Sequence, residues 1–452
     1  MDNKVKIIAA VVIVALMVGA VAWYVQQNTS QSGPTTSVTE STSQPLVTLT
    51  FWTLYDQLRV NTFQEIFNNF TAQNPGIQVN LVSYPQTLES TKIIQAVTSG
   101  TVPDVFFMPD YLVGTLYGMG ALSDLTQRIT VFNDFNHIAL EPATRDGKIV
   151  GVPFTMYNDG VYYRIDRFKE LGLPLPNGNW TTDDFLRDAL ALTRVVNGTQ
   201  QYGFGMRGSG AGSVEYATTF MYAFGGDVVN SSGQVVVNST QAVQGLQWYV
   251  DLCTKYKVCP PSAPSDGWAQ MSADFGRGVT SMYIHNCAGV QDQNGYNPGN
   301  GTATNPTWGT APIPIGPTGK RVSYMGEYLL GLMSGSTHQD AAWKLIQFMA
   351  SDWAMSLWNQ KIVQVPPRES VAALPVFSAD LHMAAFAYSS SFLGLVPYNI
   401  SPYPSWGGIA GTTGVTLFDE ALAGQITAQQ MANQFAAALI EGESTSTTTT
   451  QT

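Results

Sequence analysis

The feature that most constrains the fold of this chain is an alternation of short apolar strands and helices near its start. Val47–Leu54 alternates apolar and polar residues, which predicts a strand, and Asn61–Gln73 repeats its apolar residues at helical spacing. A second strand at Ile77–Ser83, a second helix at Leu88–Thr98 and a third strand at Asp104–Met108 continue the alternation. Such strands pair in parallel, in a sheet that helices cover on both faces, so the sequence predicts an α/β fold.

The rest of the chain repeats this mixture without a fixed period, which excludes a solenoid. The chain has 452 residues, of which 44% are hydrophobic, so it is too long for one core and apolar enough for two. Further helices are expected at Thr182–Val195, Val214–Phe224, Ser239–Tyr256, Gln339–Ser351 and Ala428–Ile440, and further strands at Lys148–Pro153, Val161–Arg164, Ser281–His285 and Glu327–Met333.

The charge balance excludes one class of partner. Lys and Arg number 21 against 32 Asp and Glu, which gives a net charge of −11, and no window is rich in Lys or Arg. Because a nucleic-acid-binding surface needs concentrated positive charge, we expect no nucleic-acid partner.

Residues 1–27 have the character of a membrane segment. Ile7–Val25 contains no charged residue and as a helix would span about 28 Å, close to the ~30 Å thickness of the hydrocarbon layer. Two lysines precede this stretch and the next Lys or Arg is Arg59, which places the body of the chain outside the cell. The length of the segment favours a retained anchor, and a cleaved signal peptide is the alternative.

Two polar segments flank the body of the chain. Residues 28–46 are rich in Ser, Thr and Gln and predict an extended tether, and residues 442–452 predict a disordered tail of Ser and Thr. Glycosylation sequons become usable outside the cell, so the chain is expected to be a glycoprotein. The sequons are at Asn28, Asn69, Asn179, Asn197, Asn230, Asn238, Asn300 and Asn399.

Three cysteines bear on the compartment. Cys253 and Cys259 are close enough in sequence to form a small disulfide loop, as an oxidising exterior permits. Three unlinked buried thiols, including Cys287, are the alternative.

Seven segments stand in an order typical of one known family. They are Ser99–Val105, Asp146–Pro153 with Val161–Tyr163, Leu171–Phe185, Phe275–Gly278 ending in Met282, Ala311–Pro317, Ala341–Lys344, and Pro402–Trp406 with Ala423–Thr427. Together they resemble the family 1 extracellular solute-binding proteins, the sugar receptors of ABC importers. The resemblance runs from Val47 to about Ile440. One departure is Arg164, where the family usually has Asn after its Tyr-Tyr pair.

The resemblance implies a two-lobed fold like that of maltose-binding protein, with a hinge and a ligand cleft between the lobes. Lobe one would comprise residues 47–155 and 312–367, and lobe two residues 156–311 and 368–441. It further implies a monomer of the archaeal type with an N-terminal membrane anchor, which closes on a sugar and delivers it to the ABC permease. No cofactor, metal or catalytic residue is expected.

A sugar presents an apolar C–H face and a polar rim, so its receptor needs aromatic rings beside carboxylates and amides. Ligands on parallel sheets bind beyond the carboxyl ends of the strands. The suitable residues after the first and third strands are Trp52, Tyr55, Asp56, Asp110 and Tyr111. The resemblance adds Tyr157, Glu215, Tyr216, Asn286, Glu327 and Trp406, with Trp268 and Trp308 in reserve.

Each of these residues has a structural alternative. Trp52 follows a buried strand and could belong to the core, whereas Trp406 is flanked by prolines and glycines and favours an exposed platform. Asp56 and Asp110 could cap the helices that follow them. Glu215 and Glu327 could form salt bridges at the surface of a lobe.

Other functions have weaker support in the sequence. Gly203–Gly208 matches the dinucleotide-binding pattern G-x-G-x-x-G, but the residues before it suggest a polar loop, so a flexible glycine loop is favoured. The four histidines show no metal-ligand spacing, and a G-x-S-x-G motif is missing. A secreted glycoside hydrolase needs only two carboxylates and stays the alternative, as does a peptide or metal receptor on the same architecture.

Overall fold

The computed structural model describes residues 46–54, 56–129, 134–210, 212–296, 307–380, 382–383, 385–386, 394–397 and 409–449. The expected membrane segment and tether, apart from Leu46, lie outside these residues. Within the described part of the chain, none of the helices is both long and apolar enough to cross a bilayer.

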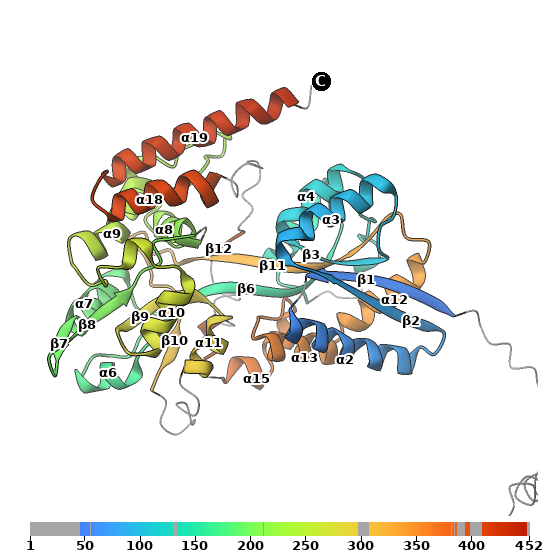
Figure 1. Cartoon of the computed structure of the whole chain (residues 1–452), viewed down its shortest axis with the longest axis horizontal. Coiled ribbons are helices and arrows are strands. Elements are labelled where there is room, and N and C mark those ends of the chain that lie inside the picture. Colours follow the sequence, from blue (N-terminus) through green and yellow to red (C-terminus); the bar gives the residue numbers. More distant parts are fainter. Residues whose placement is uncertain are drawn as a thin grey trace, which may run out of the picture. The chain divides into compact units, whose positions relative to one another are not determined.

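The expected alternation of strands and helices opens the first lobe (Figure 1). β1 (Val47–Leu54), α2 (Gln57–Gln73), β2 (Ile77–Tyr84), α3 (Gln86–Ser99) and β3 (Val105–Pro109) follow one another. β1 pairs in parallel with both β2 and β3, which confirms the predicted parallel arrangement.

Two long strands carry the sheet from one lobe to the other. The described sheet runs in the order β2-β1-β3-β11-β6-β9-β8-β7, so β11 (Val322–Leu332) and β6 (Val152–Tyr163) lie at its centre (Figure 1). The first part of β6, up to Asn158, pairs with β11, and its last part, Asp159–Tyr163, pairs with β9 (Thr280–Asn286). Any residue near the middle of β6 therefore lies at the junction of the lobes.

The apolar residues pack into separate cores on the two sides of this junction. In the first lobe, Phe63 of α2 and Trp358 of α13 are buried with their ring centroids 4.1 Å apart. In the second, Phe220 of α8 stacks on Tyr249 of α9 at 5.0 Å. The first core extends to Phe377, past the boundary at residue 367 that the resemblance implies, because α14 and α15 pack against it.

The remaining elements complete the two lobes. They are α4 (Asp110–Gly118), α5 (His137–Ala143), β4 (Thr144–Arg145), β5 (Lys148–Ile149), α6 (Ile165–Glu170), α7 (Thr182–Leu192), β7 (Arg194–Val196), β8 (Thr199–Gly205), α8 (Gly212–Ala223), α9 (Thr240–Thr254), η2 (Ala263–Ser265), α10 (Trp268–Gly276), α11 (Gly289–Tyr296), β10 (Gly309–Ala311), α12 (Gln339–Met349), α13 (Asp352–Ile362), α14 (Glu369–Ala372), α15 (Pro375–Ser378), β12 (Gly394–Pro397), the π-helical η3 (Ala410–Gly414), α18 (Val415–Leu422) and α19 (Ala428–Thr449).

Two expectations are corrected by the structure. The residues before Gly203 form the strand β8 rather than a polar loop, since β7 and β8 make a hairpin and β8 pairs with β9. Gly203 is there for packing, because a Cβ on it would lie 1.9 Å from the backbone oxygen of Ala189 in α7. Helix α19 continues to Thr449, so the tail expected to be disordered from residue 442 begins as helix, and no proline interrupts it.

The cysteines follow the first of the two expected arrangements. Cys253, at the end of α9, and Cys259 are joined by a disulfide bond, and Cys287 is a buried free thiol.

Candidate ligand-binding site

Two carboxyl groups meet where β3 and β11 pair. Asp110 follows β3 as the first residue of α4, and Tyr328 of β11 pairs with Pro109, so Glu327 lies beside Asp110. Both side chains are buried, and Asp110 Oδ1 accepts a hydrogen bond from the Tyr111 N–H at 2.7 Å. Within the described residues, Asp110 Oδ2 and both carboxylate oxygens of Glu327 have no hydrogen-bond partner. Burial raises the pKa of Asp110 to about 7, and burial and the charge of Asp110 raise the pKa of Glu327 well above its usual range.

A second pair of carboxyl groups belongs to the other lobe. Asp159 lies opposite Asn286 in the last part of β6, and Glu215 is in the first turn of α8. The two carboxyl groups share a hydrogen bond; burial, followed by the charge of Glu215, raises the pKa of Asp159 well above its usual range. The pKa of Glu215 is raised to about 7. Burial and the charge of Asp110 raise this pKa, and the charge of Arg207 lowers it. The two pairs are therefore electrostatic neighbours across the junction of the lobes.

A close contact at the start of α8 positions the arginine of this site. A Cβ on Gly212 would lie 2.1 Å from Nη1 of Arg207, so only glycine lets the guanidinium lie against the first turn of the helix. Nε of Arg207 donates to the backbone oxygen of Ser209 at 3.1 Å. The guanidinium is held beside Glu215, where it partly offsets the negative charge.

Aromatic and amide groups border the second pair of carboxyl groups. The Asn286 N–H donates to Nδ1 of His285 at 2.9 Å, so this nitrogen carries no proton and accepts the Tyr216 hydroxyl at 3.2 Å. Burial lowers the pKa of His285 to about 3, which keeps the ring neutral. Trp268, the first residue of α10, is 47% exposed, and its ring centroid is 6.1 Å from that of His285.

The structure thus brings four of the expected residues to one junction: Asp110, Glu327, Glu215 and Asn286. Tyr216 is buried beside them, and its hydroxyl is hydrogen-bonded to His285.

Other expected residues have different surroundings. Trp52 is half-buried and packs edge-on against Tyr84 at 5.1 Å. Asp56 is exposed and caps α2 by accepting the Arg59 N–H at 2.9 Å, which is the structural alternative considered for it. Tyr111 is 39% exposed.

The structure describes two of the four remaining aromatic candidates. Trp308 is 1% exposed and stacks on His382 at 3.7 Å, which places it in the core. Tyr157 is half-buried in the middle of β6. Tyr55 and Trp406 lie outside the described residues.

Two residues of the site were missed from the sequence. Asp159 stands in a strand that is buried at all but one position, and a carboxylate there is a signal, because an unpaired buried charge is strongly disfavoured. Arg207 lies in the glycine-rich segment that was interpreted as a flexible loop. Neither residue could be placed near Glu215 without the fold.

The carboxyl groups do not converge closely enough to hold a metal. In the described ranges, groups of three or more His, Cys, Asp or Glu side chains suited to a metal ion do not occur. What the site offers is a set of hydrogen-bond acceptors spread over both lobes, which suits an organic molecule better than an ion.

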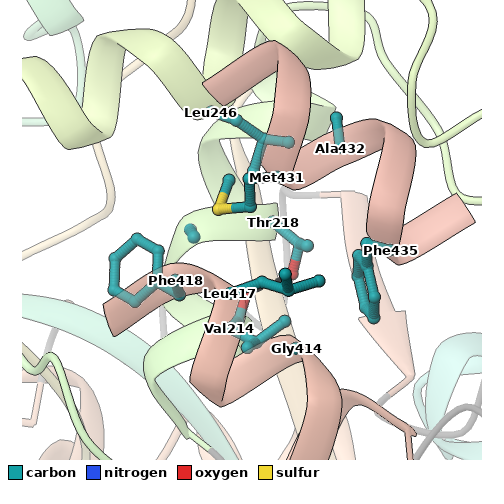
Figure 2. Close-up of a pocket in the computed structure, with 10 residues that line it drawn as sticks. Val214, Thr218, Leu246, Gly414, Leu417, Phe418, Met431, Ala432 and Phe435 are labelled. Carbon is teal, nitrogen blue, oxygen red and sulfur yellow. Dashed lines mark hydrogen bonds between the residues drawn. The ribbon is translucent and has the colours of Figure 1, made fainter. Parts of the chain in front are cut away.

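A pocket behind α8 is separate from this polar junction. Figure 2 shows it between α8, α18 and α19, lined by apolar side chains that include Leu417, Met431 and Phe435. Its volume of about 10 Å³, the space open to the centre of a water molecule, is far too small for a saccharide. This pocket is a packing void of the second core.

A glycine on β11 sets the place of Tyr157. A Cβ on Gly326 would lie 2.1 Å from the Tyr157 ring, so Gly326→Ala should displace this ring and lower the free energy of unfolding by about 1–3 kcal/mol in urea denaturation. Gly331→Ala on the same strand is the control, because a Cβ there meets only side-chain ends, those of Met108 at 3.3 Å and Leu122 at 3.5 Å. Equal losses of stability in the two variants would contradict the claim that Gly326 makes room for the Tyr157 ring.

Comparison of the sequence with known proteins finds related binding proteins. Residues 57–355 match the family model of the bacterial extracellular solute-binding proteins. A putative binding protein of Brucella abortus (strain 2308) is 26% identical over 371 residues, which cover 78% of this chain and 82% of that protein. The mannitol-binding protein of Pseudomonas aeruginosa is 28% identical over 271 residues, 57% of this chain and 56% of that protein.

Solved structures resemble the whole body of the chain. Maltose-bound MalE3 of T. maritima superposes with a TM-score of 0.71 at 24% identity, over 87% of this chain and 99% of that one. The sugar-binding protein MalE of Xanthomonas citri gives a TM-score of 0.75 at 20% identity, over 87% and 98% of the two chains. The fold is the two-lobed α/β fold that the sequence predicted.

Proposed function

Because this chain belongs to the bacterial extracellular solute-binding protein family, we propose that it captures a mono- or oligosaccharide between its lobes and delivers it to the permease of an ABC importer. The lobes close on the ligand by bending at β6 and β11, the strands that they share. Because contacts from both lobes to the ligand exist only in the closed form, binding shifts the population toward that form.

The observation that carries the proposal is the position of the buried carboxyl groups. Asp110 and Glu327 come from one side of the junction and Asp159 and Glu215 from the other. Carboxylates that accept several hydrogen bonds are the groups that bind the hydroxyls of a sugar. Trp52, Tyr55, Tyr111, Tyr157 and Trp406 are proposed as the aromatic part of the site, joined by Trp268.

The arrangement supports binding without turnover. Asp159 and Glu215 share a hydrogen bond, whereas the two carboxyl groups of a retaining glycosidase stand about 5 Å apart with the sugar between them. We therefore expect no product when a saccharide is incubated with the protein. Residues 1–27 are proposed to anchor a monomeric glycoprotein to the outer face of the membrane.

A thermal-shift screen of neutral and charged saccharides, followed by calorimetric titration of the hits, tests the proposal. Asp110→Asn should weaken binding of a hit by at least about tenfold, because the amide replaces one acceptor oxygen with an NH2 group, which can only donate. Asp56→Asn, at the same edge of the sheet but exposed, should leave affinity unchanged. Binding of none of the saccharides, or release of a hydrolysis product, would overturn the proposal.

A further inference from the structure

The carboxyl groups at the junction leave buried acceptor atoms without donors. Asp110, Asp159 and Glu327 are 2%, 1% and 0% exposed, and Oδ2 of each aspartate and both oxygens of Glu327 lack a hydrogen-bond partner among the described residues. A buried acceptor without a donor destabilises the fold. A ligand that donates hydrogen bonds at these atoms relieves that penalty, so the site favours a ligand rich in donors.

The local charge narrows the choice of ligand. On the side of lobe two, Arg207 acts on both Asp159 and Glu215, and on the side of lobe one, Arg145 acts on Asp110. Glu327 feels the charge of Asp110, and within the described residues neither carboxyl group forms a salt bridge, so burial disfavours the ionised form of both. A neutral sugar can donate to the unpartnered oxygens, whereas an ammonium group also stabilises the ionised carboxylates by its positive charge.

An exposed aromatic ring lies beside the residues that border the second pair of carboxyl groups. Trp268 is 47% exposed beside His285, which is hydrogen-bonded to Tyr216, the neighbour of Glu215 in α8. An exposed indole face attracts both the C–H face of a sugar and a nearby positive charge. Because Asp110 and Glu327 belong to lobe one and Trp268 to lobe two, a ligand that contacts all three has to extend across the junction.

We propose that the ligand is an amino sugar, or an oligosaccharide that contains one, with its protonated amine between Asp110 and Glu327 and a sugar ring against Trp268. This inference rests on the proposed function and narrows its substrate class from saccharides to cationic saccharides.

Matched pairs of saccharides test the inference by calorimetric titration at pH 7. The probes are glucosamine, chitobiose and chitotriose, each compared with its N-acetylated form and with glucose or cellobiose as neutral partners. We expect at least one amine to bind about tenfold or more tightly than its neutral partners. Glu327→Gln should reduce this preference to less than about threefold, because the amide keeps the shape of the side chain but cannot ionise beside the bound amine.

Two further variants separate the amine contact from the ring contact. Trp268→Ala should weaken the amine and the neutral partner alike, by roughly tenfold, since both lose the same stacking surface. Asp340→Asn, with a side chain that is 92% exposed, is the control and should retain the wild-type affinities. Thermal unfolding of each variant checks that it is folded.

The outcomes distinguish this inference from the proposed function. If neutral partners bind as tightly as the amines, the charge argument is wrong while the saccharide receptor stands. If the preference for amines survives in Glu327→Gln and in Asp110→Asn, the amine is held elsewhere and the inference is overturned. If no saccharide of either kind binds, both proposals fail.

Discussion

The protein should become more stable as the pH is lowered from 8 to about 5. Asp110, Glu215 and Glu89 are the basis of this expectation, because burial raises the pKa of each of these carboxyl groups to about 7. In the unfolded chain the same groups titrate near pH 4. Between about pH 4 and pH 7 the folded state therefore binds more protons, and the free energy of unfolding increases as the pH falls through 7.

The expected effect is large. Each of these groups corresponds to about 3–4 kcal/mol in the limit of full titration. The charges of Glu327, Asp159, Arg207 and Arg145 near the junction carboxyl groups change this limit. His285 does not contribute in this range, because burial lowers its pKa to about 3.

The carboxyl group of Asp104 has the opposite effect on stability at low pH. Hydrogen bonds from Ser336, Thr50 and His338 outweigh burial and lower the pKa of Asp104. The stability that this carboxylate contributes is present above its unfolded pKa and is lost as the pH falls through its lower folded value. Maximum stability is thus expected at about pH 4–6.

Thermal unfolding followed by circular dichroism between pH 4 and pH 8 measures this dependence. The unfolding temperature should rise by several degrees on acidification from pH 8 to pH 5, and Asp110→Asn should flatten the rise, because the amide has no proton to gain. A maximum near neutral pH that is lost on mild acidification would contradict the expectation.

Trp358→Ala should produce the largest loss of stability from a single substitution. The indole of Trp358 is fully buried and lies 4.1 Å from Phe63, 5.3 Å from Phe107 and 5.4 Å from Phe154, measured between ring centroids. Truncation leaves a large cavity among these rings, and we expect a loss of about 3–5 kcal/mol in the free energy of unfolding.

The same helix supplies the control for this prediction. Trp353 is 45% exposed and touches only the edge of the core, with its ring 5.8 Å from Phe348. Trp353→Ala should lower the free energy of unfolding by less than about 1 kcal/mol in urea denaturation. A similar loss in the two variants would mean that Trp358 is not at the centre of the first core. Because β6 and β11 join the lobes, damage to this core should also weaken binding at the junction.

The elements of the first lobe were predictable because their signals are local. The alternation of apolar and polar residues in Val47–Leu54 is imposed by the geometry of one strand, and β1 has these same bounds. The next helix was predicted to begin at Asn61, but α2 begins at Gln57. The difference arises because the first turn of α2 is polar and Asp56 caps it. The hairpin of β7 and β8 was missed because its residues are mostly polar and are held by pairing with each other and with β9.

The candidate site was likewise predictable only in part. By itself the sequence determined the α/β class and the solute-binding family, since these depend on periodicity and on motifs read along the chain. Asp110, Glu215 and Glu327 were named from the sequence as candidate ligand residues, and their role stays a prediction. Only the tertiary structure decided that Asp159 and Arg207 join them, that Asp56 caps a helix and that Trp268 lies beside His285. The physical reason is that burial, charge coupling and hydrogen-bond partners depend on distances between residues far apart in the sequence, and those distances are set by how β6 and β11 join the two lobes.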